Sequence, residues 1–168
     1  MAESDLTANR IRDLLEYDPL TGVFSWRVAR GSALVGVRAG TVERNGYRRI
    51  KIDRRFYYAH RLAHIYMTGA WPARMVDHRN GARDDNRWAN LRECDTAQNA
   101  QNTAKASKNT SGLRGVHWHK AAAKWRASIM VAGKNISLGL FFSKDEAHSA
   151  YLAAKSGLHA FQPVLRNA

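Results

Sequence analysis

The polar stretch 76–102, VDHRNGARDDNRWANLRECDTAQNAQN, contains the residues best suited to carry out chemistry. An acid and a histidine are adjacent at Asp77 and His78, and asparagines recur along the stretch. Adjacent residues of a strand point to opposite faces, so Asp77 can hold a cation while His78 reaches a water molecule. A neutral histidine suits general-base chemistry near pH 7. Carboxylate and amide oxygens are hard ligands that suit Mg²⁺ or Mn²⁺ better than zinc.

The charge of the chain is high and unevenly distributed. The formal net charge is +13 and the pI is about 10.5, which indicates an anionic partner, with nucleic acid first and an acidic membrane surface second. The net charge is +6 over residues 1–75, −1 over 76–102 and +8 over 103–168. The polar stretch is therefore a poor phosphate clamp by itself and a good place to hold a cation.

Length and composition limit the class of protein. The chain has 168 residues, of which 45% are hydrophobic, enough for one ordinary domain or two small ones. No apolar run approaches the roughly 18 residues of a spanning helix, and the start lacks the order of a signal peptide. We expect a cytoplasmic protein with no membrane partner. A single cysteine, Cys94, excludes an internal disulfide or multi-cysteine zinc site, and we expect it to be buried.

Local signals predict a mixed chain of the α+β class. Thr7 is a candidate N-cap, Asp53-Arg54 a hairpin turn and Gly69 a helix stop. The elements expected before residue 107 are a helix over 7–16, a strand over 23–28, a hairpin over 47–61, a helix over 62–68, strands over 75–77 and 90–95, and a helix over 96–106. The region from residue 75 onward is thus predicted as strand, loop, strand and helix.

The remainder predicts a sheet braced by one helix. Residues 107–112, SKNTSG, are typical of a linker. Strands are expected over 113–119, 124–132 and 134–142, with a turn at Ala132-Gly133. A helix follows over 143–157, with Ser143 and Glu146 as a capping box and Gly157 as its stop.

In this arrangement residues 75–102 resemble the ββα-metal motif of HNH nucleases, in the branch found in phage and group I intron homing endonucleases. The matching residues are Asp77-His78-Arg79-Asn80-Gly81, then Asn90-Leu91, then Asn99. The preceding segment, AHRLAHIYMTGAWP, also resembles what precedes the motif in phage members. The resemblance covers the chain from about Tyr17 to Asn102.

This resemblance implies roles for individual residues. Asp77 and Asn99 would bind one Mg²⁺ or Mn²⁺ ion, and Asn102, one helical turn further along, is the rival ligand. His78 would be the general base. Asn90 would be an orienting residue that ties the loop to the backbone or ring of His78.

The implied activity is metal-dependent hydrolysis of double-stranded DNA to 5′-phosphate and 3′-hydroxyl ends. The implied setting is a phage or mobile-element homing endonuclease, which would act in the host-cell cytoplasm if phage-encoded. One active site per chain favours a monomer that nicks, unless two chains meet. The alternatives are a non-catalytic DNA-binding regulator with a decayed nuclease core and an RNA-binding module. His60 and His64 have metal-ligand spacing, but with Arg61 beside them a structural or phosphate-facing role is favoured.

Residues 113–155 resemble the Apetala/ethylene-response-factor type of DNA-binding domain. The matching segments are RGVHWH, KWRASI, LG and DEAHSAYLAA. In that family a three-stranded sheet enters the major groove and one helix braces its back. The resemblance and strand alternation predict that one face of the sheet contacts DNA and that the other, with Ile129 and Val131, faces the helix. One of the two tryptophans, Trp118 or Trp125, is expected to be buried in the core. The residues expected to contact DNA are Arg114, Trp118, Lys124, Arg126, Ser128 and Lys134, with Val116 on the same face as Arg114 and Trp118.

The hairpin of residues 47–61 offers a second basic surface, with a merely solvated basic face as the equal alternative. Its candidate DNA contacts are Arg48, Arg49, Lys51, Arg54 and Arg55. The predicted organisation is an N-terminal helix and β-rich extension (1–74), the nuclease motif (75–106), the linker (107–112) and the DNA-binding domain (113–168).

Overall fold

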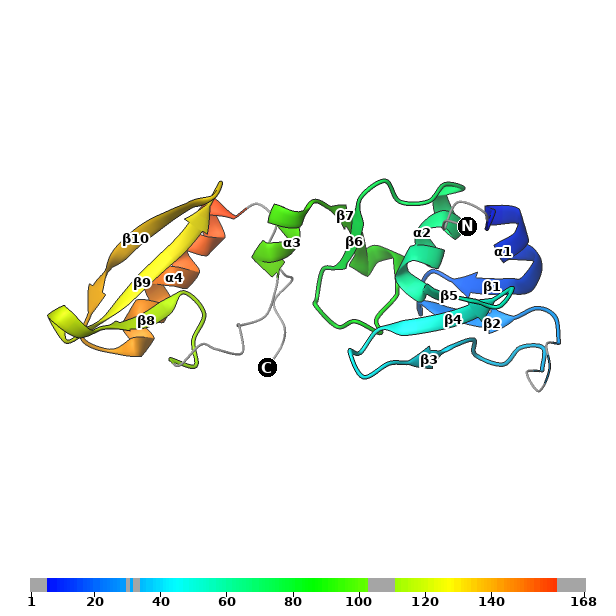
Figure 1. The fold of residues 1–168 in the computed structure, drawn as a ribbon, viewed down its shortest axis with the longest axis horizontal. Helices are drawn as coiled ribbons and strands as arrows, with labels where there is room; N and C mark the ends of the chain where they lie inside the picture. The colour runs from blue at the N-terminus through cyan, green and yellow to red at the C-terminus, as the bar shows by residue number, and fades with distance from the viewer. Residues whose placement is uncertain (1–5, 30, 32–33, 103–110, 160–168) are drawn as a thin grey trace. The chain divides into compact units, whose positions relative to one another are not determined.

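The structure is a computed structural model that describes residues 6–29, 31, 34–102 and 111–159, with the side chains of 100–102 left out. It contains two compact units, the first ending at Thr96 and the second beginning at Ala97 (Figure 1). Most of the predicted linker, residues 107–110, lies outside the described residues, as does the predicted helical extension over 103–106. Within the described ranges, no helix combines the length and apolar character needed to cross a membrane.

The first unit begins with a short helix followed at once by a hairpin. Helix α1 (Ala8–Leu14) is capped by Thr7, whose side chain accepts a hydrogen bond from the backbone N–H of Arg10 at 3.2 Å, as predicted. The helix ends at Leu14 and not at residue 16, because Leu15 is extended and pairs with Trp26. Strand β1 (Leu15–Asp18) therefore pairs antiparallel with β2 (Val23–Trp26).

A three-stranded sheet follows, in the order β3-β4-β5. Its strands are β3 (Thr41–Val42), β4 (Arg48–Ile52) and β5 (Arg55–Tyr58). The predicted hairpin turn is confirmed, since Asp53 and Arg54 have φ angles of 45° and 68°, as a tight two-residue turn requires. Helix α2 (Ala59–Thr68) ends at Gly69, which has the left-handed conformation expected of a stop.

The predicted strand, loop, strand and helix are all present. Strands β6 (Met75–His78) and β7 (Leu91–Cys94) form a two-stranded antiparallel sheet. The loop between them contains the short 3₁₀ helix η2 (Trp88–Asn90), and helix α3 (Thr96–Asn102) follows. Val76 and Leu91 join the same hydrophobic core as α1, β1 and α2, and Cys94 is buried as predicted. The pair of strands is thus anchored by the nearby α2 and also by α1 and β1, which lie more than 50 residues earlier in the chain.

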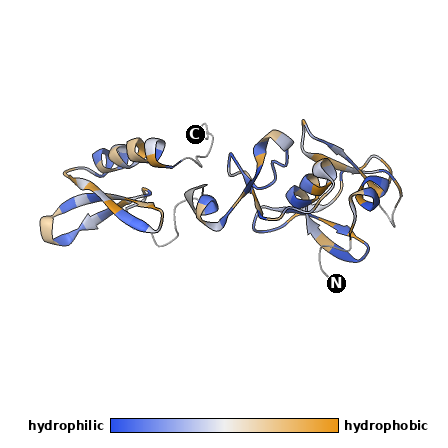
Figure 2. Ribbon diagram, turned by 90° about the horizontal axis from the view of Figure 1, so that it is seen from above, coloured by the Kyte–Doolittle hydropathy of each residue, from blue (hydrophilic) through white to orange (hydrophobic). Residues whose placement is uncertain are grey.

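Beyond α3, the second unit is a three-stranded antiparallel sheet with one helix against it, as predicted. The sheet order is β10-β9-β8, and the elements are β8 (Val116–His119), η3 (Lys120–Ala122), β9 (Lys124–Val131), β10 (Lys134–Phe141) and α4 (Lys144–Leu158). Hydrophobic and hydrophilic segments alternate along α4, as expected of a helix with one buried face (Figure 2). The Ser143–Glu146 capping box is confirmed. The predicted stop at Gly157 is wrong, because the helix continues to Leu158 and its cap is His159.

The predicted distribution of side chains over this sheet is wrong in part. Val116 is buried against Ala127 and against Ala147 of α4, so it lies on the helix-facing side of the sheet. Trp118, two residues further along the strand, faces the same side. Its ring lies 5.1 Å from that of its cross-strand partner Trp125. Of the two tryptophans, Trp125 packs against the core and Trp118 is 47% exposed.

The opposite face carries Lys124, Arg126 and Ser128, which alternate with buried Ala127 and Ile129. Lys134 pairs with Val131 and Arg114 lies beside Tyr151 of α4, so neither shares the face of Arg126. The residues predicted to form one DNA-contacting face are therefore divided between two.

Candidate active site

Strand β6 places the two residues of greatest chemical interest on opposite faces, as the alternation predicted. Asp77 pairs in register with Arg92, and His78 with Leu91. His78 is 2% exposed and lies against the core of the first unit, whereas Asp77 is half-buried on the other side of the strand.

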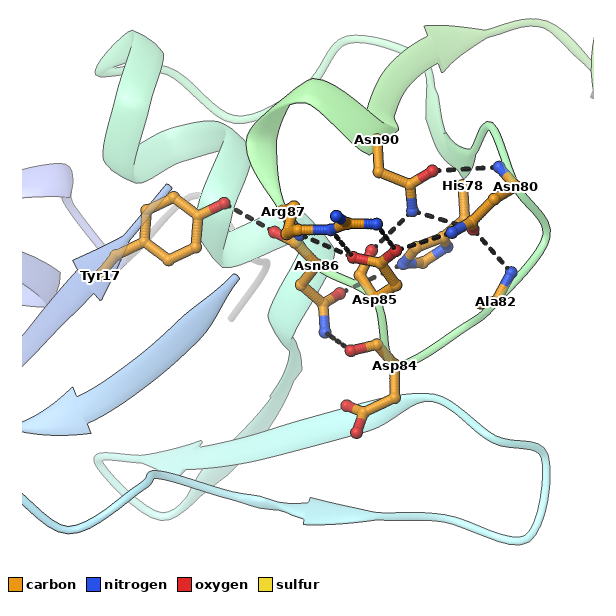
Figure 3. A network of polar contacts seen from close by, with 9 residues as sticks. All are labelled: Tyr17, His78, Asn80, Ala82, Asp84, Asp85, Asn86, Arg87 and Asn90. Carbon is orange, nitrogen blue, oxygen red and sulfur yellow. Dashed lines mark hydrogen bonds and ion pairs between the residues drawn. The ribbon is translucent and has the colours of Figure 1, made fainter. Parts of the chain in front are cut away.

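His78 is surrounded by rings and by one amide. Its Nε2 atom lies 3.2 Å from Oδ1 of Asn86 (Figure 3). Its ring is edge-on to His60, with centroids 5.1 Å apart, and tilted against Tyr47 at 5.8 Å. Burial lowers the pKa of His78, while the hydrogen bond to Asn86 and the charge of Asp77 oppose that shift. The imidazole is therefore neutral at pH 7, the state that a general base needs.

Asn90 closes the loop that follows β6. Its Oδ1 accepts from the backbone N–H of Asn80 at 3.0 Å, and its Nδ2 donates to Oδ1 of Asn80 at 3.0 Å and to the carbonyl of Asp85 at 2.7 Å. The prediction that Asn90 binds His78 itself is wrong. Because His78 is opposite Leu91 in the β6–β7 register, Asn90 lies one step beyond the strand pair, opposite Arg79 and Asn80.

The loop is also held by an internal carboxylate. Oδ2 of Asp85 accepts from Nδ2 of Asn80 at 2.6 Å, and the carboxylate pairs with Arg87 through bonds of 2.8 and 2.6 Å. The hydrogen bond from Arg87 is the largest cause that lowers the pKa of Asp85. Asp85 is thus ionised and committed to holding the loop.

Distant elements hold the residue that touches the histidine. The hydroxyl of Tyr17 donates to the backbone carbonyl of Asn86 at 2.6 Å, and Nδ2 of Asn86 donates to the carbonyl of Asp84 at 3.1 Å (Figure 3). Arg48 makes two bonds to the Asp84 carboxylate, at 2.8 and 3.0 Å, and one to the carbonyl of Gly40. The expectation that Arg48 belongs to a DNA-contacting surface is wrong, because its side chain is 10% exposed and braces this loop.

The expected metal ligand Asp77 has a cationic neighbour. Nη2 and Nε of Arg92 lie 3.1 and 3.3 Å from Oδ2 of Asp77, and the two side chains are 10% and 12% exposed, respectively. Asn99 lies on α3 and is half-buried, so its role as second ligand stays a prediction. The rival, Asn102, has its side chain outside the described residues. No group of three or more His, Cys, Asp and Glu side chains suited to a metal occurs in the part of the chain that the structure describes.

The histidines at metal-ligand spacing have separate surroundings. His60 is buried, its Nδ1 has no hydrogen-bond partner, and burial lowers its pKa to about 3. Nε2 of His64 contacts Glu93 at 3.2 Å, and its Nδ1 lies 3.1 Å from the carbonyl of Ala70. These contacts agree with the structural role favoured from the sequence.

The basic hairpin presents a mixed cationic and aromatic surface. The register puts Arg49 and Lys51 on the same face as Phe56, and the two cations lie 4.0 and 5.6 Å from the centre of its ring. Phe56 is 53% exposed, and Arg49 also pairs with Glu43 at 2.6 Å. Arg54 lies exposed in the turn and Arg55 is half-buried at the start of β5.

Comparison with known proteins agrees with the motif. A family model described as HNH endonuclease matches residues 57–101, a region that contains α2, β6, the loop, β7 and nearly all of α3. No curated protein matches the chain. The chain is similar to a solved structure described as "DNA binding and cleavage by the HNH homing endonuclease I-HmuI", with 20% identity, a TM-score of 0.43, and coverage of 80% of this chain and 75% of that one.

Three contributors to the site were missed in the sequence. Asn86 contacts the histidine, Arg92 contacts the aspartate, and Tyr17 holds the loop from a remote strand. Arg92 could have been found from the strand register, because Asp77 and Arg92 are cross-strand neighbours once His78 is aligned with Leu91. Asn86 carried no local signal that separated it from the other asparagines of the loop.

Proposed function

We propose that this protein is a metal-dependent HNH endonuclease that hydrolyses double-stranded DNA to 5′-phosphate and 3′-hydroxyl ends. The observation that carries the proposal is the arrangement around β6, where a neutral histidine, held through one nitrogen, is adjacent to a carboxylate. Support comes from the match of residues 57–101 to the HNH endonuclease family. The resemblance of the motif to phage and intron members extends the proposal to a homing-type enzyme, and one active site per chain favours a monomer.

The residues present fit a hard divalent cation. Asp77 offers carboxylate oxygens at the edge of β6, and the adjacent guanidinium of Arg92 shows that this position already balances a positive charge. Asp77, with Asn99 as the second oxygen ligand, would hold one Mg²⁺ or Mn²⁺ ion. When bound, the ion would polarise the scissile phosphate and stabilise charge on the leaving 3′ oxygen.

The remaining chemistry falls to His78 and its loop. Because Nε2 is directed at Asn86, Nδ1 is the nitrogen that accepts a proton from the attacking water. The water oxygen bonds to phosphorus as the bond from phosphorus to the 3′ oxygen breaks, and that oxygen is protonated from solvent. Asn90 and Asp85 keep the loop closed around the ring, so the base is aligned before DNA arrives.

Two basic surfaces would grip the duplex. The hairpin face with Arg49 and Lys51 surrounds an exposed aromatic ring, which suits contact with phosphates and sugars. In the second unit, the face with Lys124, Arg126 and Ser128 is directed away from the core. Because this region is a three-stranded sheet with one helix, as the resemblance to the Apetala/ethylene-response-factor type of domain implies, we assign DNA contact to this face.

The test is conversion of supercoiled plasmid with and without Mg²⁺. Wild type should nick the plasmid only with the metal, and DNA ligase should reseal the nick without prior phosphorylation if the ends are as proposed. Replacing His78 with Ala should lower cleavage about 10²–10⁴-fold and leave DNA affinity nearly unchanged. Replacing His148, on α4, with Ala is the matched control and should preserve cleavage. Equal cleavage by wild type and His78→Ala would remove His78 from the mechanism.

A second candidate function is a DNA-binding regulator without catalysis. It is favoured by the 2% exposure of His78 and by the ion pair between Asp77 and Arg92. The nuclease requires a water molecule to reach the His78 ring and a metal ion to reach Asp77. Specific DNA binding with no plasmid conversion at any Mg²⁺ or Mn²⁺ concentration would favour the regulator.

A further inference from the structure

We infer that Asn86 is the positioning residue that selects which nitrogen of His78 acts as the base. Its amide oxygen holds the proton on Nε2 and so leaves Nδ1 as the proton acceptor. The inference deepens the proposed function and rests on it for the catalytic role of the ring. The hydrogen bond itself can be tested without any cleavage.

The direction of the bond follows from the chemistry of the amide. An amide oxygen only accepts, so Nε2 of His78 must donate when it faces Oδ1 of Asn86, 3.2 Å away. Exchanging the oxygen and nitrogen of that amide would place Oδ1 against the carbonyl of Asp84, which now accepts from Nδ2 at 3.1 Å. Two oxygens would then face each other without a hydrogen, so the second bond of Asn86 fixes the orientation of the first.

Asn86 is itself held from three directions. It is 1% exposed, and its backbone carbonyl accepts from the Tyr17 hydroxyl at 2.6 Å. Asp84, whose carbonyl accepts from Nδ2 of Asn86, is fixed by Arg48 of β4. Gly22 packs so closely that a Cβ atom there would lie 2.4 Å from the carbonyl carbon of Asn86. A side chain held in this way positions its partner at little cost in side-chain entropy.

The contacts separate this role from that of Asn90. The side chain of Asn90 bonds to Asn80 and to the carbonyl of Asp85, so Asn90 shapes the loop. Asn86, in contrast, directs its amide oxygen at the ring of His78 (Figure 3). Loss of Asn90 should loosen the loop as a whole, whereas loss of the Asn86 side chain should release the ring.

The experiment measures the tautomer of His78 by ¹⁵N NMR of the full chain at a pH where the ring is neutral. Wild type should show a single tautomer with the proton on Nε2, and Asn86→Ala should move toward a mixture. Tyr17→Phe is the matched control, because it removes a bond to the backbone of Asn86 and leaves the side-chain acceptor in place; it should keep the wild-type pattern. In plasmid cleavage, Asn86→Ala should lower kcat about 10–100-fold with little change in KM.

Two outcomes would overturn the inference. One is a wild-type spectrum with the proton on Nδ1, a measurement that needs no variant and survives any folding failure of Asn86→Ala. The other is a folded Asn86→Ala with the wild-type tautomer and kcat. Absence of cleavage in wild type, with the Nε2-protonated ring observed, would refute the proposed nuclease and leave the assignment of the hydrogen bond supported.

Discussion

The buried His60 should make the first unit sensitive to acid. Its ring stacks on Tyr58 and lies edge-on to His78, and it is 7% exposed. Burial, followed by the proximity of His78 and Arg61, lowers its pKa from 6.5 to about 3. A histidine whose folded pKa is depressed contributes stability above pH 6.5 that is lost as the pH falls towards 3, because the unfolded chain takes up the proton first.

The size of the effect follows from these two pKa values. At pH 4, His60 is protonated in the unfolded chain and largely unprotonated in the folded chain. This pH lies about 2.5 pH units below the unfolded pKa of 6.5. At roughly 1.4 kcal/mol per unit, the free energy of unfolding should fall by about 3 kcal/mol between pH 7 and pH 4. The loss is a large fraction of the total stability of a small unit.

The assay compares wild type with His60→Phe, which keeps an aromatic ring at this position and removes the titration. Urea unfolding would be followed by tryptophan fluorescence at several pH values from 7 to 4. Both proteins would also carry Trp118→Phe and Trp125→Phe, so that the fluorescence reports on the first unit alone. The remaining tryptophans, Trp26, Trp71 and Trp88, all lie in that unit. The free energy of unfolding should decline about 3 kcal/mol more in wild type than in His60→Phe. His117→Phe, an exposed site in the second unit, is the control and should follow wild type.

Parallel pH curves for wild type and His60→Phe would refute the reasoning. They would mean that the His60 ring is protonated as easily in the folded chain as in the unfolded one. A constant offset between the curves would not bear on the prediction, because replacing histidine by the larger phenylalanine changes packing at every pH.

Three further perturbations test the loop, the candidate metal ligand and the second basic surface. Gly22→Ala should destabilise the first unit by more than about 1 kcal/mol in urea unfolding, because φ is +73° and a Cβ would meet the backbone of Asn86; unchanged stability would contradict this packing. Arg92→Gln should lower the Kd for Mn²⁺, measured by electron paramagnetic resonance, because Asp77 loses a cationic neighbour; an unchanged Kd would count against Asp77 as a ligand. Arg126→Ala should reduce the slope of log affinity for DNA against log salt by about 0.9 if it neutralises one phosphate, and an unchanged slope would remove it from the DNA contacts.

The sequence by itself determined the features that depend on near neighbours. Thr7 and Ser143 cap helices because their hydroxyls reach a backbone N–H three residues away, and Asp53-Arg54 turns a hairpin between two alternating strands. The order of strand, loop, strand and helix around Asp77 and His78 was predicted for the same reason. Alternation along β6 also placed these two side chains on opposite faces.

Only the tertiary structure decided which side chains meet. Tyr17 and Asn86 are 69 residues apart in the chain, and their hydrogen bond exists because β1 and the loop share one core. Of several chemically equal asparagines, closure of the loop brings Asn86 to the ring and Asn90 to the loop backbone. Charge alone suggested that Arg48 contacts DNA, whereas folding brings it to Asp84. Spacing fixes which residues share a strand or a turn; the partner of a buried polar group is fixed by long-range packing, which leaves no periodic trace in the sequence.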